Sequence, residues 1–366
     1  MSKKIFFVLD GLSGGGAEKF WIRLANIFAD KGFNVSLVPL NKNPQNYLSL
    51  INPKIKLIYF KKHNLFLQAY LLGRFFKKEH PDIILSTLTR ANNICVMATL
   101  LSGIKTKLFV RNTSTLSQTR QNKGNFRIIL ARILYPYAAG IISLSKGVHE
   151  DCIQLGIKNK NMTVIYNFID QAQITKLSKE SIPSFRINNG PCILAASRFS
   201  ENKRLDYIIR AFHALTEQYP TYQHATLCIL GKGSAAMQQK LEKLIHTLNL
   251  QNKVFLKGFF ENPYPFFVQT DLFVHASKTE GLSNILLAAL ALKCNIVATD
   301  CPSGPKEILE NGTYGRLIPV SDDISILTKA MHDALEKPMD KNKFIHAVDK
   351  FSVDPIVQQY MDTIKN

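Results

Sequence analysis

The 366-residue sequence lacks the cysteine patterns of zinc sites and disulfide frameworks. Its six cysteines form no CxxC pair, and several of them lie in apolar runs, which favours reduced and buried thiols. We therefore expect neither a metal site nor disulfide bonds, as in a protein of a reducing cytoplasm.

Long apolar runs are also missing, because none reaches the roughly 20 residues that a membrane-spanning helix needs. The apolar residues 5–9 follow Lys3 and Lys4 but end at Asp10, so they are too few for the apolar region of a signal peptide. They are typical of a first buried strand instead. We expect a cytoplasmic protein that at most lies on the surface of a membrane.

Acidic residues are scarce in the first half of the chain. Residues 1–180 contain 26 Lys and Arg against 9 Asp and Glu, whereas residues 181–366 contain 20 against 18. Such a basic domain attracts nucleic acid, anionic lipid headgroups or phosphorylated substrates, although solubility alone is the plain alternative. Nucleic acid is disfavoured, since the aromatic residues follow no recognised RNA- or DNA-binding motif.

The chain is long enough for two domains, and apolar strands alternate with helical patterns along it. This alternation indicates two α/β domains, each with a parallel, doubly wound sheet. Periodicity is lost over residues 171–189, which we interpret as a linker between domains at 1–170 and 190–352. The other strands expected between residues 35 and 299 are 35–39, 55–60, 83–87, 107–111, 140–144, 192–196, 226–230, 271–275 and 295–299. Helices are expected at 341–350 and 353–366.

A glycine-rich turn follows the first strand. Gly14, Gly15 and Gly16 allow the backbone to come close to a ligand, and Glu18 lies in the first turn of the helix that follows, where the helix dipole favours a negative charge. A tight turn without a ligand is the alternative.

Two cations stand five residues apart at the start of the second domain. Arg198 and Lys203 follow a predicted strand and are placed to bind a diphosphate, one with a planar fork and one as a point charge. An exposed pair of loop cations is the alternative. Further on, Gly231, Gly233 and Ala236 match the G-x-G-x-x-A pattern of nicotinamide enzymes, but no acidic residue ends a following strand as that interpretation requires.

Residues 275–308 combine the features of an anion-binding site. A strand end leads into a turn with Glu280 and Gly281 and then into an apolar helix over 284–292. The next strand runs into a loop before Glu307 begins another helix. A carboxylate and free backbone amides at the carboxyl end of a parallel strand suit a nucleotide or a sugar phosphate.

These segments resemble the signature region of the family 4 glycosyltransferases, which have the GT-B fold and retain anomeric configuration. The resemblance lies in EGLSN at 280–284 and DCPSGPKEI at 300–308, and it extends to GGAE at 15–18 and to the cation pair at Arg198 and Lys203. It implies two Rossmann-like domains that face a cleft, with the last helix crossing back to the first domain. The donor-binding residues that it implies are Gly15, Gly16, Arg198, Lys203, Gly231, Gly233, Gly258, Glu280, Gly281, Leu282, Ser283 and Asn284.

The resemblance also implies the chemistry. No Asp-x-Asp triplet is present, so we expect transfer from a nucleotide sugar without a metal or other cofactor. Arg198, Lys203 and backbone amides would neutralise the leaving diphosphate, which is electrostatic stabilisation by preorganised donors. Glu280 would bind donor-sugar hydroxyls and favour the positively charged ring. A carboxylate at a helix N-terminus without chemistry is the alternative for Glu280.

One position departs from the family pattern. Ala288 stands eight residues after Glu280, where the family has a second glutamate that holds the ribose of the donor. The alternative function is therefore a catalytically degenerate homologue that binds a glycan or a partner protein.

The acceptor side is expected in the basic first domain. Arg90, Arg111 and Asn112 follow apolar strands, so that they would grip an acceptor phosphate or else cap the next helices. Two segments, 61–78 and 120–134, combine basic and apolar residues. They are typical either of helices that lie in a membrane interface or of ordinary surface helices. The cations of the second segment are Arg120, Lys123, Arg127 and Arg132. Together with the resemblance to bacterial enzymes, these features suggest a UDP-sugar donor, a lipid-linked or lipopolysaccharide-core glycan acceptor, and a peripheral position at the inner face of the cell membrane.

Overall fold

The computed structural model describes residues 2–12, 15–42, 47–118, 126–182 and 190–365. The chain divides into two compact units, each described by itself. Unit 1 consists of Met1–Asn167 and Asp354–Asn366, and unit 2 consists of Phe168–Val353.

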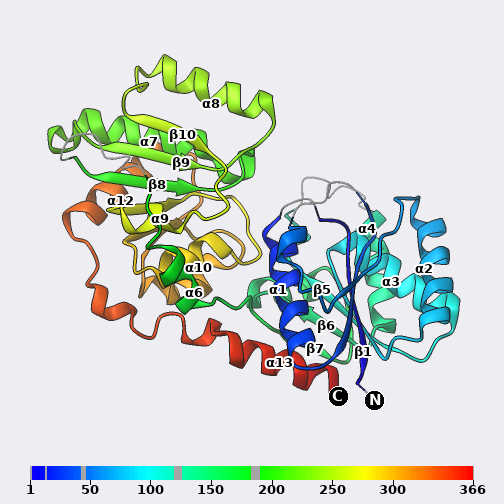
Figure 1. Cartoon of the computed structure of the whole chain (residues 1–366). Helices are drawn as coiled ribbons and strands as arrows, with labels where there is room; N and C mark the ends of the chain where they lie inside the picture. The colour runs from blue at the N-terminus through cyan, green and yellow to red at the C-terminus, as the bar shows by residue number, and fades with distance from the viewer. Residues whose placement is uncertain (1, 13–14, 43–46, 119–125, 183–189, 366) are drawn as a thin grey trace. The chain divides into compact units, whose positions relative to one another are not determined.

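Unit 1 is built on a seven-stranded parallel sheet with the order β3-β2-β1-β4-β5-β6-β7. Helices α2, α3 and α4 cover one face of the sheet, and α1 and α13 lie on the other side (Figure 1). The strands are β1 (Lys4–Leu9), β2 (Asn34–Pro39), β3 (Lys56–Leu57), β4 (Ile83–Thr87), β5 (Lys107–Asn112), β6 (Gly140–Ser143) and β7 (Met162–Val164), and the helices are α1 (Gly16–Asp30), α2 (Leu65–Glu79), α3 (Thr89–Ser102), α4 (Phe126–Leu134), α5 (Lys146–Gln154) and α13 (Val353–Lys365).

Continuous apolar strands explain this sheet. Residues 5–9 of β1 are buried on both faces, as in a central parallel strand, and Ile5 pairs with Val35 on one side and Ile83 on the other. The strand predicted over residues 55–60 is shorter in the structure, where β3 covers only Lys56–Leu57, although the amides of Ile58 and Phe60 still donate to carbonyls of β2 at 2.9 and 3.0 Å. This edge segment has a partner on one side only, so few ladder hydrogen bonds hold it extended.

Unit 2 repeats the architecture with a six-stranded parallel sheet in the order β10-β9-β8-β11-β12-β13. The predicted strands 83–87, 192–196 and 226–230 are confirmed residue for residue. The strands of unit 2 are β8 (Cys192–Ala196), β9 (Thr226–Leu230), β10 (Val254–Gly258), β11 (Leu272–His275), β12 (Ile296–Thr299) and β13 (Arg316–Ile318), and its α-helices are α6 (Gln171–Leu177), α7 (Leu205–Gln218), α8 (Ala235–Thr247), α9 (Tyr264–Val268), α10 (Asn284–Ala291), α11 (Pro305–Ile308) and α12 (Ile324–Glu336).

Two predictions for unit 2 need correction. Residues 171–177 of the expected linker form α6, because Asp170 caps the helix by accepting a hydrogen bond from the Gln173 amide at 2.9 Å. Residues 183–189 of that linker lie outside the described residues. The helix expected over residues 341–350 is instead two short 3-10 helices, Lys341–Phe344 and Asp349–Phe351.

Each sheet has one point at which the strand order reverses. This point falls between β1 and β4 in unit 1 and between β8 and β11 in unit 2. Open α/β sheets bind ligands beyond the carboxyl ends of the two strands at such a point. The loops after these four strands are therefore the places to look for a site.

The last helix, α13, completes the core of unit 1. Lys107 Nζ donates to the Lys365 carbonyl at 2.7 Å, and the ring centroids of Phe20 and Tyr360 lie 6.4 Å apart. The guanidinium of Arg111 lies 4.6 Å from the Phe20 ring centroid and donates to Asn167 Oδ1. Burial lowers the pKa of Arg111 from its usual value. Aromatic faces thus take the place of a carboxylate around this buried cation.

Within the described ranges, no helix combines the length and the apolar character needed to cross a bilayer.

We expect Arg111→Ala to lower the free energy of unfolding by about 3 kcal/mol, because it leaves a cavity beneath α1 and exposes the packed rings. Urea denaturation followed by the fluorescence of Trp21, the only tryptophan, measures this change close to the site of substitution. The exposed Arg74 provides the control, and Arg74→Ala should stay within about 0.5 kcal/mol of wild type. Equal effects of the two substitutions would contradict a core role for Arg111.

Candidate functional site

The carboxylate of Glu280 lies at the reversal point of the unit 2 sheet, where three donors converge on one of its oxygens. Oε1 accepts hydrogen bonds from Ser277 Oγ at 2.6 Å and from His275 Nε2 at 3.0 Å, and it pairs with Lys203 Nζ. No donor from the described part of the chain contacts Oε2. One oxygen anchors the side chain, and the other is left for a ligand.

The charge of Glu280 is fixed by these neighbours. Its side chain is only 11% exposed, and burial alone would raise the pKa of the carboxyl. The Lys203 ammonium and the His275 ring outweigh burial and hold the pKa of Glu280 well below its usual range. The carboxylate is therefore ionised at neutral pH.

The backbone around Glu280 is held from two sides. Its amide donates to the Pro302 carbonyl at 2.8 Å, and its own carbonyl accepts from the Ser303 amide at 3.0 Å. On the other side, Asn202 Nδ2 donates to the Thr279 carbonyl at 2.8 Å. Segments that follow β8, β11 and β12 thus meet at one carboxylate.

Sequence reasoning missed three of these residues. Asn202, His275 and Ser277 were not predicted as site residues, although His275 and Ser277 come directly at or after β11 and Asn202 lies beside Lys203. Their positions could have indicated a role, since all three lie at or after the carboxyl ends of the two strands at the reversal point.

The two predicted phosphate-binding cations differ in their surroundings. Lys203 is 20% exposed and is paired with Glu280, whereas Arg198 is exposed, and no acceptor in the described residues contacts its guanidinium. The structure therefore gives Lys203 a second contact that the sequence did not indicate, and it leaves the planar fork of Arg198 open to an anion.

The turn that leads into α10 presents backbone amides. Ser283 caps the helix by accepting from the Leu286 amide at 3.4 Å, and Asn284 is its exposed first residue. No acceptor in the described residues contacts the amides of Gly281, Leu282 and Ser283, although these three residues are largely buried. Such amides at a helix N-terminus favour an anionic ligand.

The glycines predicted around the nucleotide allow two loops to pack closely. Gly231 has φ +135°, a Cβ at this position would lie 1.8 Å from the Ser197 carbonyl oxygen, and its amide donates to the Gly258 carbonyl at 2.7 Å. A Cβ at Gly233 would lie 2.3 Å from the Phe199 carbonyl oxygen. These glycines thus fix the loop that carries Arg198.

The glycine-rich turn of unit 1 is partly occupied by the chain itself. The Gly15 amide donates to Glu18 Oε2 at 3.0 Å, so that this amide already has an acceptor, and Gly16 is the first residue of α1. Gly14 lies outside the described residues. A direct phosphate contact from the Gly15 amide would require Glu18 to release it.

The predicted acceptor residues are less accessible than expected. Arg111 and Asn112 are 1% and 2% exposed, so the expectation that they face an acceptor is wrong in this structure; both end β5 inside the core. Arg90 is bound internally by Asp10 Oδ1, by Gln68 Oε1 at 2.8 Å and by the His63 carbonyl at 3.1 Å. Arg120 and Lys123 lie outside the described residues.

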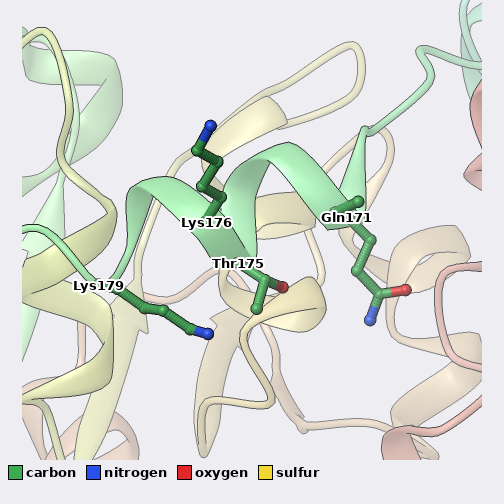
Figure 2. A pocket seen from close by; sticks show the side chains of 5 residues that line it. Gln171, Thr175, Lys176 and Lys179 are labelled. Carbon is green, nitrogen blue, oxygen red and sulfur yellow. The ribbon is translucent and has the colours of Figure 1, made fainter.

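A separate hollow of about 470 Å³ lies against α6 in unit 2. Gln171, Thr175 and Lys176 lie on this helix, and Lys179 follows its end (Figure 2). None of the sequence-predicted site residues belongs to this lining, so the hollow is not the site around Glu280.

Two parallel sheets of this topology, with a carboxylate and a cation at one reversal point, are the arrangement expected of a GT-B glycosyltransferase. The sequence matches the family model "Glycosyl transferases group 1" over residues 178–351 and the model "Glycosyltransferase Family 4" over residues 14–173. The chain therefore belongs to the glycosyltransferases of this family and is a transferase, as the motifs predicted.

Two curated relatives illustrate the similarity. The chain is 31% identical over 366 residues to the N-acetylgalactosamine-N,N'-diacetylbacillosaminyl-diphospho-undecaprenol 4-alpha-N-acetylgalactosaminyltransferase of Campylobacter jejuni, with 93% of each chain covered. It is 24% identical to the lipopolysaccharide core biosynthesis glycosyltransferase LpsE of Rhizobium meliloti, over 84% of this chain and 82% of the relative.

Solved structures confirm the predicted fold. Anabaena HepE in complex with UDP-glucose superposes with a TM-score of 0.82 at 20% identity, and the match covers 99% of both chains. The apo form of the lipopolysaccharide outer core galactosyltransferase WaaB gives a TM-score of 0.74 at 18% identity, again over 99% of both chains.

We expect Lys203→Met to lower the free energy of unfolding by about 3 kcal/mol at pH 7, since it leaves the carboxylate of Glu280 without its cation. Because the folded-state pKa of Glu280 lies below the unfolded value, the contribution of the pair is present above about pH 4 and is lost as the pH falls toward the folded-state value. The stability difference between variant and wild type should therefore stay nearly constant from pH 7 to about pH 4.5 and narrow as the pH is lowered from there toward about 3.

Urea denaturation at several pH values measures this difference. Lys278 is the matched control, because it is half exposed and lies 3.9 Å from Asp322 in an open pair, so that Lys278→Met should change stability by less than about 1 kcal/mol. A pH-independent loss in the Lys203→Met variant would show that the ion pair is not its cause.

Proposed function

We propose that this glycosyltransferase retains anomeric configuration and moves a hexose or N-acetylhexosamine from a UDP-sugar to a lipid-linked glycan. The pathway would be bacterial cell-surface polysaccharide, lipopolysaccharide or glycoprotein-glycan synthesis. The observation that carries the donor side is the Glu280 carboxylate, anchored through Oε1 and open at Oε2.

In this proposal each group of the site has one task. Oε2 of Glu280 accepts hydrogen bonds from donor-sugar hydroxyls, and the negative charge stabilises a sugar ring that becomes positive in the transition state. Arg198 and the amides of Gly281, Leu282 and Ser283 bind the diphosphate as it leaves. Lys203 neutralises negative charge on both the Glu280 carboxylate and the leaving diphosphate, because its ammonium has three donors and Glu280 occupies one of them.

We propose that no metal or other cofactor takes part. An exposed guanidinium and helix N-terminal amides supply the positive charge that a metal ion provides in other transferases. UDP as the donor nucleotide is supported by the Anabaena HepE structures, which contain UDP and UDP-glucose.

The lipid-linked acceptor is supported by the names of the relatives. The Campylobacter jejuni relative is named as an N-acetylgalactosaminyltransferase that acts on an undecaprenyl diphosphate glycan, and LpsE is named for the lipopolysaccharide core. We extend this substrate class to the present chain. It also supports a cytoplasmic protein that lies peripherally at the inner face of the membrane.

We propose Asp10 as the acceptor-binding group in place of Arg90. Asp10 follows β1 at the reversal point of the unit 1 sheet, and its side chain is 42% exposed, whereas that of Arg90 is 13% exposed. Arg90 holds Oδ1 of Asp10, and no donor in the described residues contacts Oδ2. A carboxylate oriented in this way accepts hydrogen bonds from sugar hydroxyls.

Calorimetric titration with UDP, UDP-glucose, UDP-N-acetylglucosamine and UDP-N-acetylgalactosamine tests the donor site. We expect one UDP-sugar to bind at micromolar concentration, and Arg198→Ala to weaken it about tenfold or more because a charge-assisted contact to the diphosphate is lost. Lys240→Ala, which removes an exposed cation of α8 away from the predicted donor-binding residues, should change the affinity less than threefold.

The titration also separates the two functions that the sequence left open. Nucleotide binding together with release of UDP in the presence of an acceptor supports the transferase. Failure of all four nucleotides to bind would favour the degenerate homologue, for which the replacement of the second glutamate by Ala288 is the specific observation; Ala288 is buried in α10.

Asp10→Asn should raise the acceptor KM about tenfold and leave the affinity for the UDP-sugar within twofold, since the substitution weakens contacts of the acceptor and of Arg90 but none of the donor. Steady-state transfer to a short-chain polyprenyl diphosphate N-acetylgalactosamine, with calorimetry of the donor in parallel, gives both values. A change in donor affinity with an unchanged acceptor KM would place Asp10 on the donor side instead.

A further inference from the structure

Six large apolar side chains protrude from α2 and α4 of unit 1. On α2 the exposed residues are Phe66, Leu67 and Tyr70, and on α4 they are Phe126, Ile129 and Ile133. Their spacing of three and four residues places them on one face of each helix. Phe66 is 63% exposed and Ile133 is 58% exposed, so these side chains do not serve the core. We call this set the apolar rim.

Side-chain contacts place both parts of the apolar rim at the same end of α3, which lies between α2 and α4 (Figure 1). Arg90 in the first turn of α3 donates to Gln68 in the first turn of α2 at 2.8 Å. Asn93, one turn further on, donates to the Arg127 carbonyl at the start of α4 at 3.0 Å. The first turns of the three helices are thus level, and Phe66 and Phe126 flank α3.

This end of the helices is also the ligand-binding edge of the sheet. The first turn of each helix follows the carboxyl end of a strand, and the Arg90 that contacts α2 also holds Asp10 after β1. The apolar rim therefore lies along the same edge of unit 1 as the half-exposed Asp10.

Cations surround the apolar rim. Lys61 and Lys62 are exposed immediately before α2, and the exposed face of that helix continues through Arg74 to Lys77 and Lys78. On α4 the exposed Arg132 lies beside Ile133. Exposed apolar side chains among cations suit a partner that is apolar inside and negatively charged at its surface.

We propose that unit 1 docks on an anionic lipid bilayer through the apolar rim, with the basic residues around it at the headgroups. The inference deepens the proposed function and rests on it for the choice of a bilayer as partner. It goes beyond the sequence prediction of two separate interfacial segments, because the structure sets the first turns of α2 and α4 level on either side of α3, at the edge that carries Asp10. A lipid-linked acceptor held in the bilayer would then lie beside that edge.

Sedimentation with vesicles tests the proposal on the full-length protein. One vesicle type contains phosphatidylcholine with about one third phosphatidylglycerol, and the other contains phosphatidylcholine alone. We expect binding to the anionic vesicles, and an affinity at least about a hundredfold lower in the variant with Phe66→Ser, Tyr70→Ser, Phe126→Ser and Ile129→Ser, since apolar side chains that enter the interface are removed.

A second variant probes the charge separately. Lys61→Gln with Lys62→Gln should weaken binding to the anionic vesicles by about tenfold or more, since each cation near the surface contributes about fivefold. The matched control is Leu101→Ser with Ile153→Ser, which removes two apolar side chains of unit 1 that are 63% and 55% exposed but lie outside the apolar rim. This control should bind within threefold of wild type.

The outcomes separate the possible occupants of the apolar rim. Absence of wild-type binding to anionic vesicles, equal binding by the four-serine variant, or an equal loss in the control would overturn the proposal. A wild-type dimer in light scattering that the four-serine variant converts to a monomer would assign the apolar rim to a second copy of the chain. Calorimetric titration of the same variants with the UDP-sugar checks that they are folded. Vesicle binding by a wild-type protein that binds no nucleotide would refute the proposed donor but not the docking surface.

Discussion

The ion pair between Glu280 and Lys203 determines how the unit 2 site can work. Burying a carboxylate away from water costs free energy unless the carboxylate is paired. Here one oxygen of Glu280 contacts the Lys203 ammonium, the Ser277 hydroxyl and the His275 ring. The carboxylate stays negatively charged without a ligand, and its second oxygen needs no rearrangement to receive one. Preorganisation of this kind reduces the reorganisation needed during the reaction.

Other parts of unit 2 maintain this pair. The Pro302–Ser303 backbone fixes the position of Glu280, and Asn202 ties the preceding residue to the segment that carries Lys203. The close packing at Gly231 fixes the loop of Arg198 beside the same strand. Three loops with little regular structure thus gain rigidity from contacts with one another, and the sheet beneath them sets only their starting points.

Much of the fold was predictable from the sequence because it depends on local patterns. Apolar runs such as residues 192–196 predict buried parallel strands, and the signature around Glu280 points to the candidate site at the reversal point of the unit 2 sheet. Arg111 was misplaced because its burial depends on Phe20 and on Tyr360, which is 249 positions away in the sequence. Arg90 was assigned to the acceptor because its internal partner, Asp10, lies 80 positions earlier. Neither contact leaves a periodic signal, and the same holds for His275, whose role depends on where Glu280 folds back.

The return of α13 to unit 1 bears on the order in which the protein folds during synthesis. Unit 2 is one continuous stretch, Phe168–Val353, so all of its strands are available before the last helix has been made. Unit 1 is synthesised first, yet Tyr360, which is fully buried, must arrive before the rings around Phe20 are covered. A ribosome-bound chain would therefore carry an incomplete unit 1 with exposed aromatic surface until α13 has been synthesised. Unit 1 is thus begun before unit 2 and completed after it, so chaperones would have longer access to its exposed rings.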